Sequence, residues 1–147
     1  MKKILVIHGP NLHLLGQRER QHYGVHTLPQ INEMLEAEAA SLQVKLETFQ
    51  SNAEHAIIDK IVATDAQFLL INAAAYTHTS VAIRDTLLAV ALPFIEVHLS
   101  NIYNREPFRQ QSLLHDIATG VVFGLGAQSY TLALIGAARS IKMTPQD

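Results

Sequence analysis

Chemically capable side chains gather where the short apolar runs of this sequence end. The runs 4–7, 68–71 and 94–97 lead directly into His8, Asn72 and His98, and a loop rich in polar residues follows each of them. Parallel strands that deliver polar groups from their carboxyl ends to one rim are the usual way in which open α/β sheets build ligand sites. The sequence therefore predicts one polar site at the carboxyl edge of a sheet.

Glu96 and His98 are two residues apart at the end of the third run. Successive side chains of a strand point to opposite faces, so these two share a face. A carboxylate beside an imidazole fixes its tautomer and favours its protonated form, which is what a general acid needs. A purely structural pair at the end of the sheet is an equally open interpretation of this segment.

The connection after the first run, residues 9–26, is longer than the roughly two to six residues that usually join a strand to a helix. It contains Asn11, Arg18 and Tyr23. A tyrosine with an unperturbed pKa near ~10 is mostly protonated at neutral pH. A guanidinium ~4 Å away favours the phenolate by up to ~4 kcal/mol at an effective dielectric constant of ~20. Arg18 would thus make Tyr23 a base, whereas a loop tyrosine without such a neighbour more often packs as an amphipathic plug.

Two further segments bring polar groups to the same edge. Asn72 begins a stretch of small residues that leads to His78 and then to a predicted helix with Asp85, and such a stretch lets a substrate approach the backbone. Arg105 and Arg109 lie in the long loop after the third run. The alternatives are a plain helix-capping loop for the first segment and ordinary surface charge for the arginines.

Short β-branched runs alternate with longer stretches of helical periodicity. We expect strands at 3–8, 44–49, 67–72, 94–98 and 119–123. Helices should follow a capping box at Thr27 and Gln30, a cap at Asn52 with Ile57, Ile58, Ile61 and Val62 on one face, and a cap at Thr79 or Ser80, with a last helix from about Ser129 to Ile141.

This alternation predicts an α/β fold in a single domain over residues 1–147: a flavodoxin-like, doubly wound, five-stranded parallel sheet of order 2-1-3-4-5. Another three-layer strand order is the alternative. In the favoured order the first and third strands are neighbours whose crossovers lie on opposite faces. A crevice then opens above them, where the loops 9–26 and 73–79 both begin.

Charge argues against two classes of partner. The chain carries 11 basic and 13 acidic residues, a formal net charge of −2, and no basic run longer than Lys2-Lys3. Nucleic acids and anionic membranes are recognised by clustered positive charge, so neither is an expected partner. No stretch approaches the ~20 apolar residues of a membrane span. We interpret the apolar run after Lys3 as a strand, because it is too short for a signal peptide and no cleavage site follows it.

The chain has no cysteine, which excludes disulfides, thiolate nucleophiles and cysteine-ligated metals and agrees with the cytoplasmic location that we expect. Its eight histidines show no HxxxH spacing on a predicted helix, so no metal is expected. Charged residues make up 16% of the chain, below the typical value of about a quarter. Such a sparsely charged surface suggests that other subunits cover part of it.

Taken together, these segments resemble the type II 3-dehydroquinate dehydratases. The matching motifs are Gly9-Pro10-Asn11-Leu12, Leu15-Gly16, Arg18-Glu19, Tyr23-Gly24, Gln50-Ser51-Asn52, Tyr76-Thr77-His78-Thr79-Ser80, Arg84-Asp85, Glu96-Val97-His98-Leu99-Ser100-Asn101, Arg105-Glu106-Pro107-Phe108-Arg109 and Gly124-Leu125-Gly126. They follow one another in the family's order over nearly the whole chain. His8 is a departure, because the family usually has Asn there.

The resemblance implies a metal-free and cofactor-free dehydration of 3-dehydroquinate to 3-dehydroshikimate, a step of the shikimate pathway, by anti elimination through an enolate. It implies that Tyr23 is the base and Arg18 its electrostatic activator. Asn11 would hold a water that stabilises the enolate. His98, oriented by Glu96, would protonate the departing hydroxyl.

The resemblance also assigns the substrate contacts. Asn72, His78, Asp85 and Arg109 match groups that bind substrate hydroxyls, the backbone amides of Leu99 and Ser100 match the carboxylate site, and Arg105 belongs with the substrate-binding residues. The family assembles as a homododecamer, a tetramer of trimers, in which Asp85 would reach the site of a neighbouring subunit.

The lysines bear on the class of chemistry. An imine-forming enzyme needs a lysine on an active-site loop, but all five lysines fall in predicted strands, helices or termini. The competing hypothesis is a non-catalytic module that binds a sugar acid. Tyr23 discriminates between the two, because a binding module has no reason to place Arg18 beside it.

Overall fold

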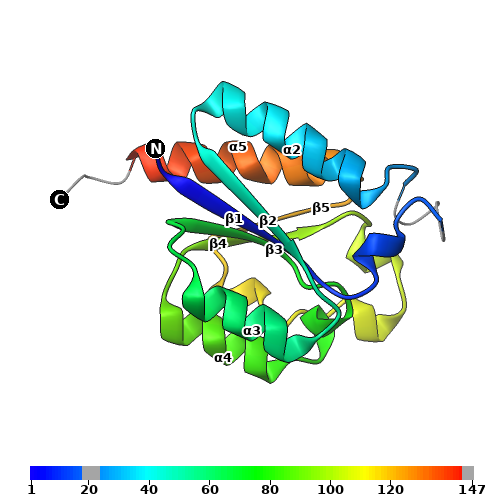
Figure 1. Ribbon diagram of the computed structural model, residues 1–147. Coiled ribbons are helices and arrows are strands. Elements are labelled where there is room, and N and C mark those ends of the chain that lie inside the picture. Colours follow the sequence, from blue (N-terminus) through cyan, green and yellow to red (C-terminus); the bar gives the residue numbers. More distant parts are fainter. Residues whose placement is uncertain (18–23, 144–147) are drawn as a thin grey trace.

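The computed structural model describes residues 1–17 and 24–143. Its strands are β1 (Lys3–His8), β2 (Lys45–Gln50), β3 (Phe68–Asn72), β4 (Phe94–His98) and β5 (Gly120–Phe123). They form one parallel sheet of order β2-β1-β3-β4-β5, shown in Figure 1. The predicted order is therefore confirmed, and each strand lies within one residue of its predicted bounds.

Helices cover both faces of the sheet. Helices α2 (Leu28–Leu42) and α5 (Gln128–Met143) lie on one face, and α3 (Glu54–Ala63) and α4 (Val81–Val90) lie on the other (Figure 1). This arrangement is the doubly wound architecture that the alternation predicts.

The sheet separates two hydrophobic cores, and β1 contributes to both. Ile4 and Val6 pack beneath α2 and α5, while Leu5 and Ile7 pack beneath α3 and α4. All four side chains have no exposed surface. A central parallel strand is covered on both faces, which explains why its sequence is continuously apolar rather than alternating.

The helix starts confirm part of the capping pattern. The Thr27 hydroxyl accepts a hydrogen bond from the backbone amide of Gln30, and the Gln30 side-chain oxygen accepts one from the backbone amide of Thr27, so the predicted capping box is present. Of the two candidates for α4, Ser80 is the cap, and it accepts from the amide of Ile83 at 2.9 Å. A 3₁₀ turn, η2 (Ala74–His78), takes up most of the predicted loop before it.

Asn52 is not the cap of α3, contrary to the prediction. Ala53 occupies the cap position, and the side-chain oxygen of Asn52 instead accepts from the backbone amide of Asn11 at 3.0 Å and from the Gln50 side chain at 3.1 Å. A tertiary hydrogen bond has thus replaced the local one. Val62 does not share the buried helix face either, since it is 63% exposed.

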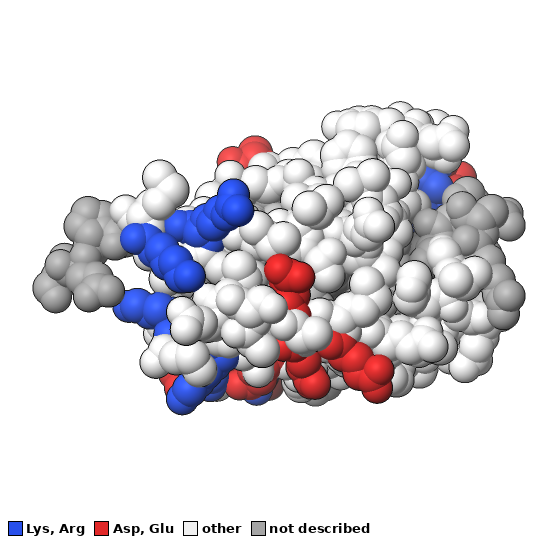
Figure 2. Space-filling view, turned by 90° about the horizontal axis from the view of Figure 1, so that it is seen from above, with Lys and Arg blue, Asp and Glu red and all other residues white. Residues whose placement is uncertain are grey.

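On the surface over α2 and α5, lysines and arginines gather toward one end and acidic residues lie nearer the middle, while most of the rest is uncharged (Figure 2). In the part of the chain that the structure describes, no helix is long and apolar enough to cross a membrane. That further copies of the chain cover some of this surface stays a prediction.

Gly9 brings the carboxyl ends of β1 and β3 together. Its amide donates to the carbonyl of Asn72 at 2.7 Å, and a Cβ at this position would lie 2.4 Å from the carbonyl oxygen of Ala73. Real Cβ atoms do not approach backbone oxygen so closely. Only glycine therefore allows the two loops that leave these strands to start side by side.

We predict that Gly9→Ala destabilises the fold by about 2 kcal/mol or more, because backbone rather than a flexible side chain must move. Urea unfolding followed by circular dichroism measures the difference. Gly120→Ala is the matched control, since a Cβ there meets nothing within 4 Å. If both variants lost the same free energy of unfolding, the close approach at Gly9 would not be what constrains this position.

His8 ends β1 inside the core with no exposed surface. Its Nδ1 lies 2.8 Å from the hydroxyl of Tyr130 on α5, and its Nε2 lies 2.9 Å from Oδ1 of Asn32 on α2. Burial lowers the pKa of His8 from 6.5 to about 4. The folded protein therefore holds this imidazole neutral at pH values where the unfolded chain would already be protonated.

Acidification should consequently destabilise the fold through His8. Below pH 6.5 His8 becomes protonated in the unfolded state, whereas in the folded state it stays neutral down to about pH 4. The free energy of unfolding therefore falls as the pH drops through this window. The full loss from this one group is roughly 3 kcal/mol. His8→Asn has no such proton uptake, so denaturation curves between pH 7 and pH 4 should show a shallower loss for the variant. Parallel pH profiles would exclude His8 as the cause.

Candidate active site

A cavity opens at the carboxyl edge of the sheet, above β1 and β3, where the crevice is expected. Segments that follow β1, β3 and β4 line it. Its lining residues are Pro10, Asn11, Leu12, Leu15, Asn72, Ala74, Ala75, His78, His98, Leu99, Ser100, Ile102, Arg105 and Arg109.

Most of the predicted site residues meet at this cavity. Those that line it are Asn11, Asn72, His78, His98, Leu99, Ser100, Arg105 and Arg109. Glu96 lies beneath them, bonded to His98. Asp85 is exposed on α4 and is not among the lining residues. Arg18 and Tyr23 lie outside the described residues.

Glu96 and His98 share a face of β4, and their side chains are hydrogen-bonded to each other through Oε2 and Nε2. Glu96 has no exposed surface, whereas His98 is 6% exposed and reaches the cavity. A fully buried carboxylate beneath an imidazole at a cavity wall is the arrangement in which a histidine is held for proton transfer.

Two further residues contact the same carboxylate, and sequence reasoning missed both. The hydroxyl of Ser112 donates to Oε1 of Glu96 at 2.9 Å, and Nδ1 of His115 lies at the same distance from that oxygen. They come from the loop that precedes β5, many residues after β4. No local periodicity links them to Glu96, so only the presence of an unassigned histidine could have drawn attention to this loop.

The electrostatic balance at Glu96 favours the ionised carboxylate. Burial by itself would raise the pKa of Glu96, but the hydrogen bonds and charges of His98 and His115 outweigh burial and hold the pKa below its usual value. The carboxylate is therefore available as a fixed negative charge beneath His98 at neutral pH.

His78 lines the cavity, and one of its ring nitrogens is left as an acceptor. Its Nδ1 donates to the backbone carbonyl of Gln111 at 2.6 Å, which leaves Nε2 as the other ring position. Burial lowers the pKa of His78, and the hydrogen bond to Gln111 only partly opposes this. A neutral imidazole held in this tautomer can accept a hydrogen bond from a ligand hydroxyl.

Asn11 lies at the mouth of the cavity in a left-handed backbone conformation, with φ of 69°. Asparagine tolerates this conformation better than most residues do. Its backbone amide is bonded to the side chain of Asn52, which fixes the turn after β1. Asn11 thus contributes to the cavity lining from a defined backbone position.

Arg105 is not an ordinary surface charge, because its side chain is only 7% exposed. One of its terminal nitrogens donates to the hydroxyl of Ser100 at 3.2 Å. Arg109 is more exposed and bonds to Glu106 at 2.8 Å. The two guanidinium groups give one side of the cavity a positive character that suits a carboxylate or hydroxyl oxygen.

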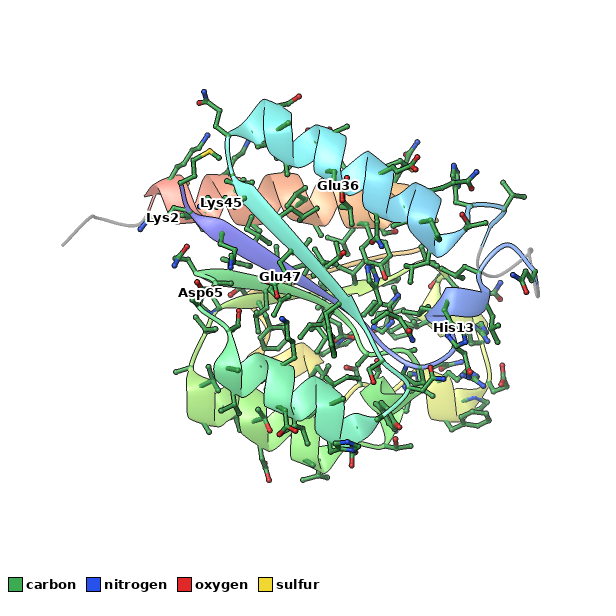
Figure 3. All side chains as sticks on the ribbon, in the orientation of Figure 1. Lys2, His13, Glu36, Lys45, Glu47 and Asp65 are labelled. Atoms are coloured by element: carbon green, nitrogen blue, oxygen red, sulfur yellow. The ribbon has the colours of Figure 1, made fainter. Side chains whose placement is uncertain are left out.

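Lysines stand away from this cavity. Figure 3 shows Lys2 and Lys45 at the end of the sheet opposite His13, which belongs to the turn after β1. Of the cavity-lining residues that the structure describes, none is lysine. The positive charge of the site is therefore supplied by arginine.

Comparison with known proteins identifies the family. The sequence model of the family dehydroquinase class II matches residues 2–138 of this chain. The chain belongs to this family. Among curated relatives, the 3-dehydroquinate dehydratase of Shewanella sediminis is 59% identical over 140 residues, which cover 95% of this chain and 93% of that protein. The resemblance drawn from the motifs, and with it the assignment to the dehydratases, a class of lyase, is confirmed.

Solved structures agree with the fold. The type II dehydroquinase of Butyrivibrio crossotus superposes with a TM-score of 0.90 at 41% identity, covering 92% of this chain and 97% of that one. The type II dehydroquinase of Propionibacterium acnes gives 0.89 at 40% identity, covering 95% and 97%. The flavodoxin-like sheet order is thus the one expected for this family.

The contact between His115 and Glu96 yields a test of the site's construction. We predict that His115→Ala lowers the free energy of unfolding by about 1–3 kcal/mol, because a buried carboxylate oxygen loses a donor. His55→Ala, a substitution at an exposed position of α3, should change it by less than about 0.5 kcal/mol. Denaturant unfolding at pH 7 measures both. A Glu96→Gln background should reduce the effect of His115→Ala, and full additivity would contradict a direct interaction.

Proposed function

We propose that this protein dehydrates 3-dehydroquinate to 3-dehydroshikimate. The observation that carries the proposal is His98, held by the buried carboxylate of Glu96 at a cavity with two arginines, in a chain of the class II dehydroquinase family. Relatives that share about three fifths of its residues are named for this reaction. The proposal includes a role in the shikimate pathway.

The reaction proceeds by anti elimination through an enolate. Tyr23, as a phenolate favoured by Arg18, removes a proton from the carbon next to the ketone, and the electrons of that bond form the enolate. Asn11 holds a water that donates to the enolate oxygen. These roles follow from the resemblance, and for Asn11 they are supported by its place at the cavity.

The second step breaks the carbon–oxygen bond. The enolate reforms the ketone, its electrons make the new carbon–carbon double bond, and the hydroxyl leaves. His98 gives that hydroxyl a proton, so the leaving group is water and the imidazole becomes neutral. Glu96 supports this step because its negative charge stabilises the imidazolium before transfer.

Substrate recognition draws on the polar lining. Arg105, which is bonded to the hydroxyl of Ser100, lines the cavity together with Leu99 and Ser100, whose backbone amides would receive the substrate carboxylate. Asn72, His78 and Arg109 would bind the hydroxyls. Asp85 is exposed on α4 outside this chain's own cavity, which is compatible with a contact to a neighbouring subunit in the proposed homododecamer.

The proposal is tested by ultraviolet absorbance of the protein mixed with 3-dehydroquinate, since the conjugated enone carboxylate of the product absorbs and the substrate does not. We expect the absorbance to rise at the same rate before and after treatment with borohydride, because no lysine lines the described cavity to form an imine. Inactivation by borohydride would contradict the imine-free reaction. Tight binding without turnover would favour the sugar-acid binding module.

In the same assay, Tyr23→Phe should abolish turnover while substrate binding changes by less than about tenfold. His98→Ala should lose a hundredfold or more, in the range that a general acid contributes. Tyr103→Phe is the matched control, because Tyr103 is 58% exposed and is not part of the cavity lining. Retention of most activity by Tyr23→Phe would contradict its assignment as the base.

A further inference from the structure

A hydrogen-bonded row of four side chains runs from the cavity through the core to α2. The Asn72 side-chain nitrogen lies 3.1 Å from the hydroxyl of Tyr130, and this hydroxyl lies 2.8 Å from Nδ1 of His8. Nε2 of His8 lies 2.9 Å from Oδ1 of Asn32. This row links Asn72 of β3, which lines the cavity, to residues of α5, β1 and α2 that do not.

All the hydrogen bonds of this row can run in one direction, from Asn72 to Asn32. Oδ1 of Asn72 accepts from the amide of Ala74 at 3.1 Å, so Nδ2 must be the atom that faces Tyr130. The Tyr130 hydroxyl accepts from Nδ2 and donates its single proton to Nδ1 of His8. His8 then carries its own proton on Nε2 and donates it to Asn32.

Burial makes a departure from this arrangement costly. His8 and Tyr130 have no exposed surface and Asn72 is 4% exposed. Burial raises the pKa of Tyr130 and lowers that of His8, so both are neutral near pH 7. A protonated His8 would direct a second N–H at the Tyr130 hydroxyl. The hydroxyl proton would then have no acceptor among these four side chains.

We propose that Tyr130 and His8 are positioning residues that lock the amide of Asn72, so that its second N–H is turned toward the cavity as a donor to a ligand oxygen. This inference rests on the proposed function, in which Asn72 binds a substrate hydroxyl. Without the lock, the Asn72 side chain is held only by the bond from the Ala74 amide to its Oδ1, so its second N–H is less firmly directed toward the cavity. The cavity would then lose its preference for an oxygen that accepts at this position.

Tyr130→Phe is the first test, because it removes the hydroxyl and keeps the ring. We expect KM for 3-dehydroquinate to rise about tenfold while kcat changes less than about threefold, since the proton-transfer groups are untouched. Leu134→Ala is the matched control: Leu134 is fully buried one turn further along α5, and it belongs to the apolar core. It should lower the melting temperature and leave KM unchanged.

A pair of substitutions at His8 separates positioning from packing. His8→Asn retains a side-chain acceptor for the Tyr130 hydroxyl, so KM should stay within about threefold of the wild type. His8→Leu fills the space without an acceptor, and its KM should rise as in Tyr130→Phe. Equal KM values for the two variants, or a KM in Tyr130→Phe equal to that of the wild type, would overturn the inference.

A spectroscopic readout keeps this inference distinct from the proposed function. In ¹⁵N NMR spectra of the wild-type protein, His8 should show the neutral Nε2–H tautomer from pH 8 down to pH 5, and the Asn72 side-chain N–H that donates to Tyr130 should exchange slowly. Tyr130→Phe should remove that protection. A wild-type protein without dehydratase activity would contradict the proposed function alone, whereas an Nδ1–H tautomer of His8 would contradict the lock alone.

Discussion

The buried carboxylate of Glu96 is the constraint on which the site depends. An isolated charge without solvent exposure costs several kcal/mol, so the fold must supply donors from whatever segments can reach it. They come from His98 on β4 and from Ser112 and His115 before β5. These hydrogen bonds to Glu96 therefore anchor both ends of the loop between His98 and Ser112. It carries Arg105 and Arg109, so the same charge that holds His98 also helps to fix the cationic side of the cavity.

Backbone geometry and periodicity explain why much of this architecture was predictable. The continuous apolar runs of β1 and β3 indicate strands covered on both faces, and their polar ends indicate the edge where ligands bind. Glu96 and His98 share a face because they are two residues apart in a strand, which is a local rule. The confirmed sheet order brings the loops after β1 and β3 together, and Gly9 allows their close start.

Tertiary competition explains what sequence reasoning missed. Asn52 satisfies the local pattern of a helix cap, yet the turn at Asn11 offers its side chain a partner that no sequence window contains. The burial of Arg105 and the approach of His115 to Glu96 likewise depend on how a long loop folds back. Such contacts are set by the whole fold, whereas periodicity reports only on neighbours along a strand or helix.

His8 and His98 occupy similar positions in the sheet but have different hydrogen-bond partners. Both end parallel strands at the same edge of the sheet, and both are almost fully buried. His8 meets a hydroxyl and an amide, so nothing compensates a charge and the ring stays neutral. His98 meets a carboxylate, which supplies the countercharge that an imidazolium requires. The proposed role of His98 as a proton donor therefore depends on Glu96, the acidic partner that shares its face of β4.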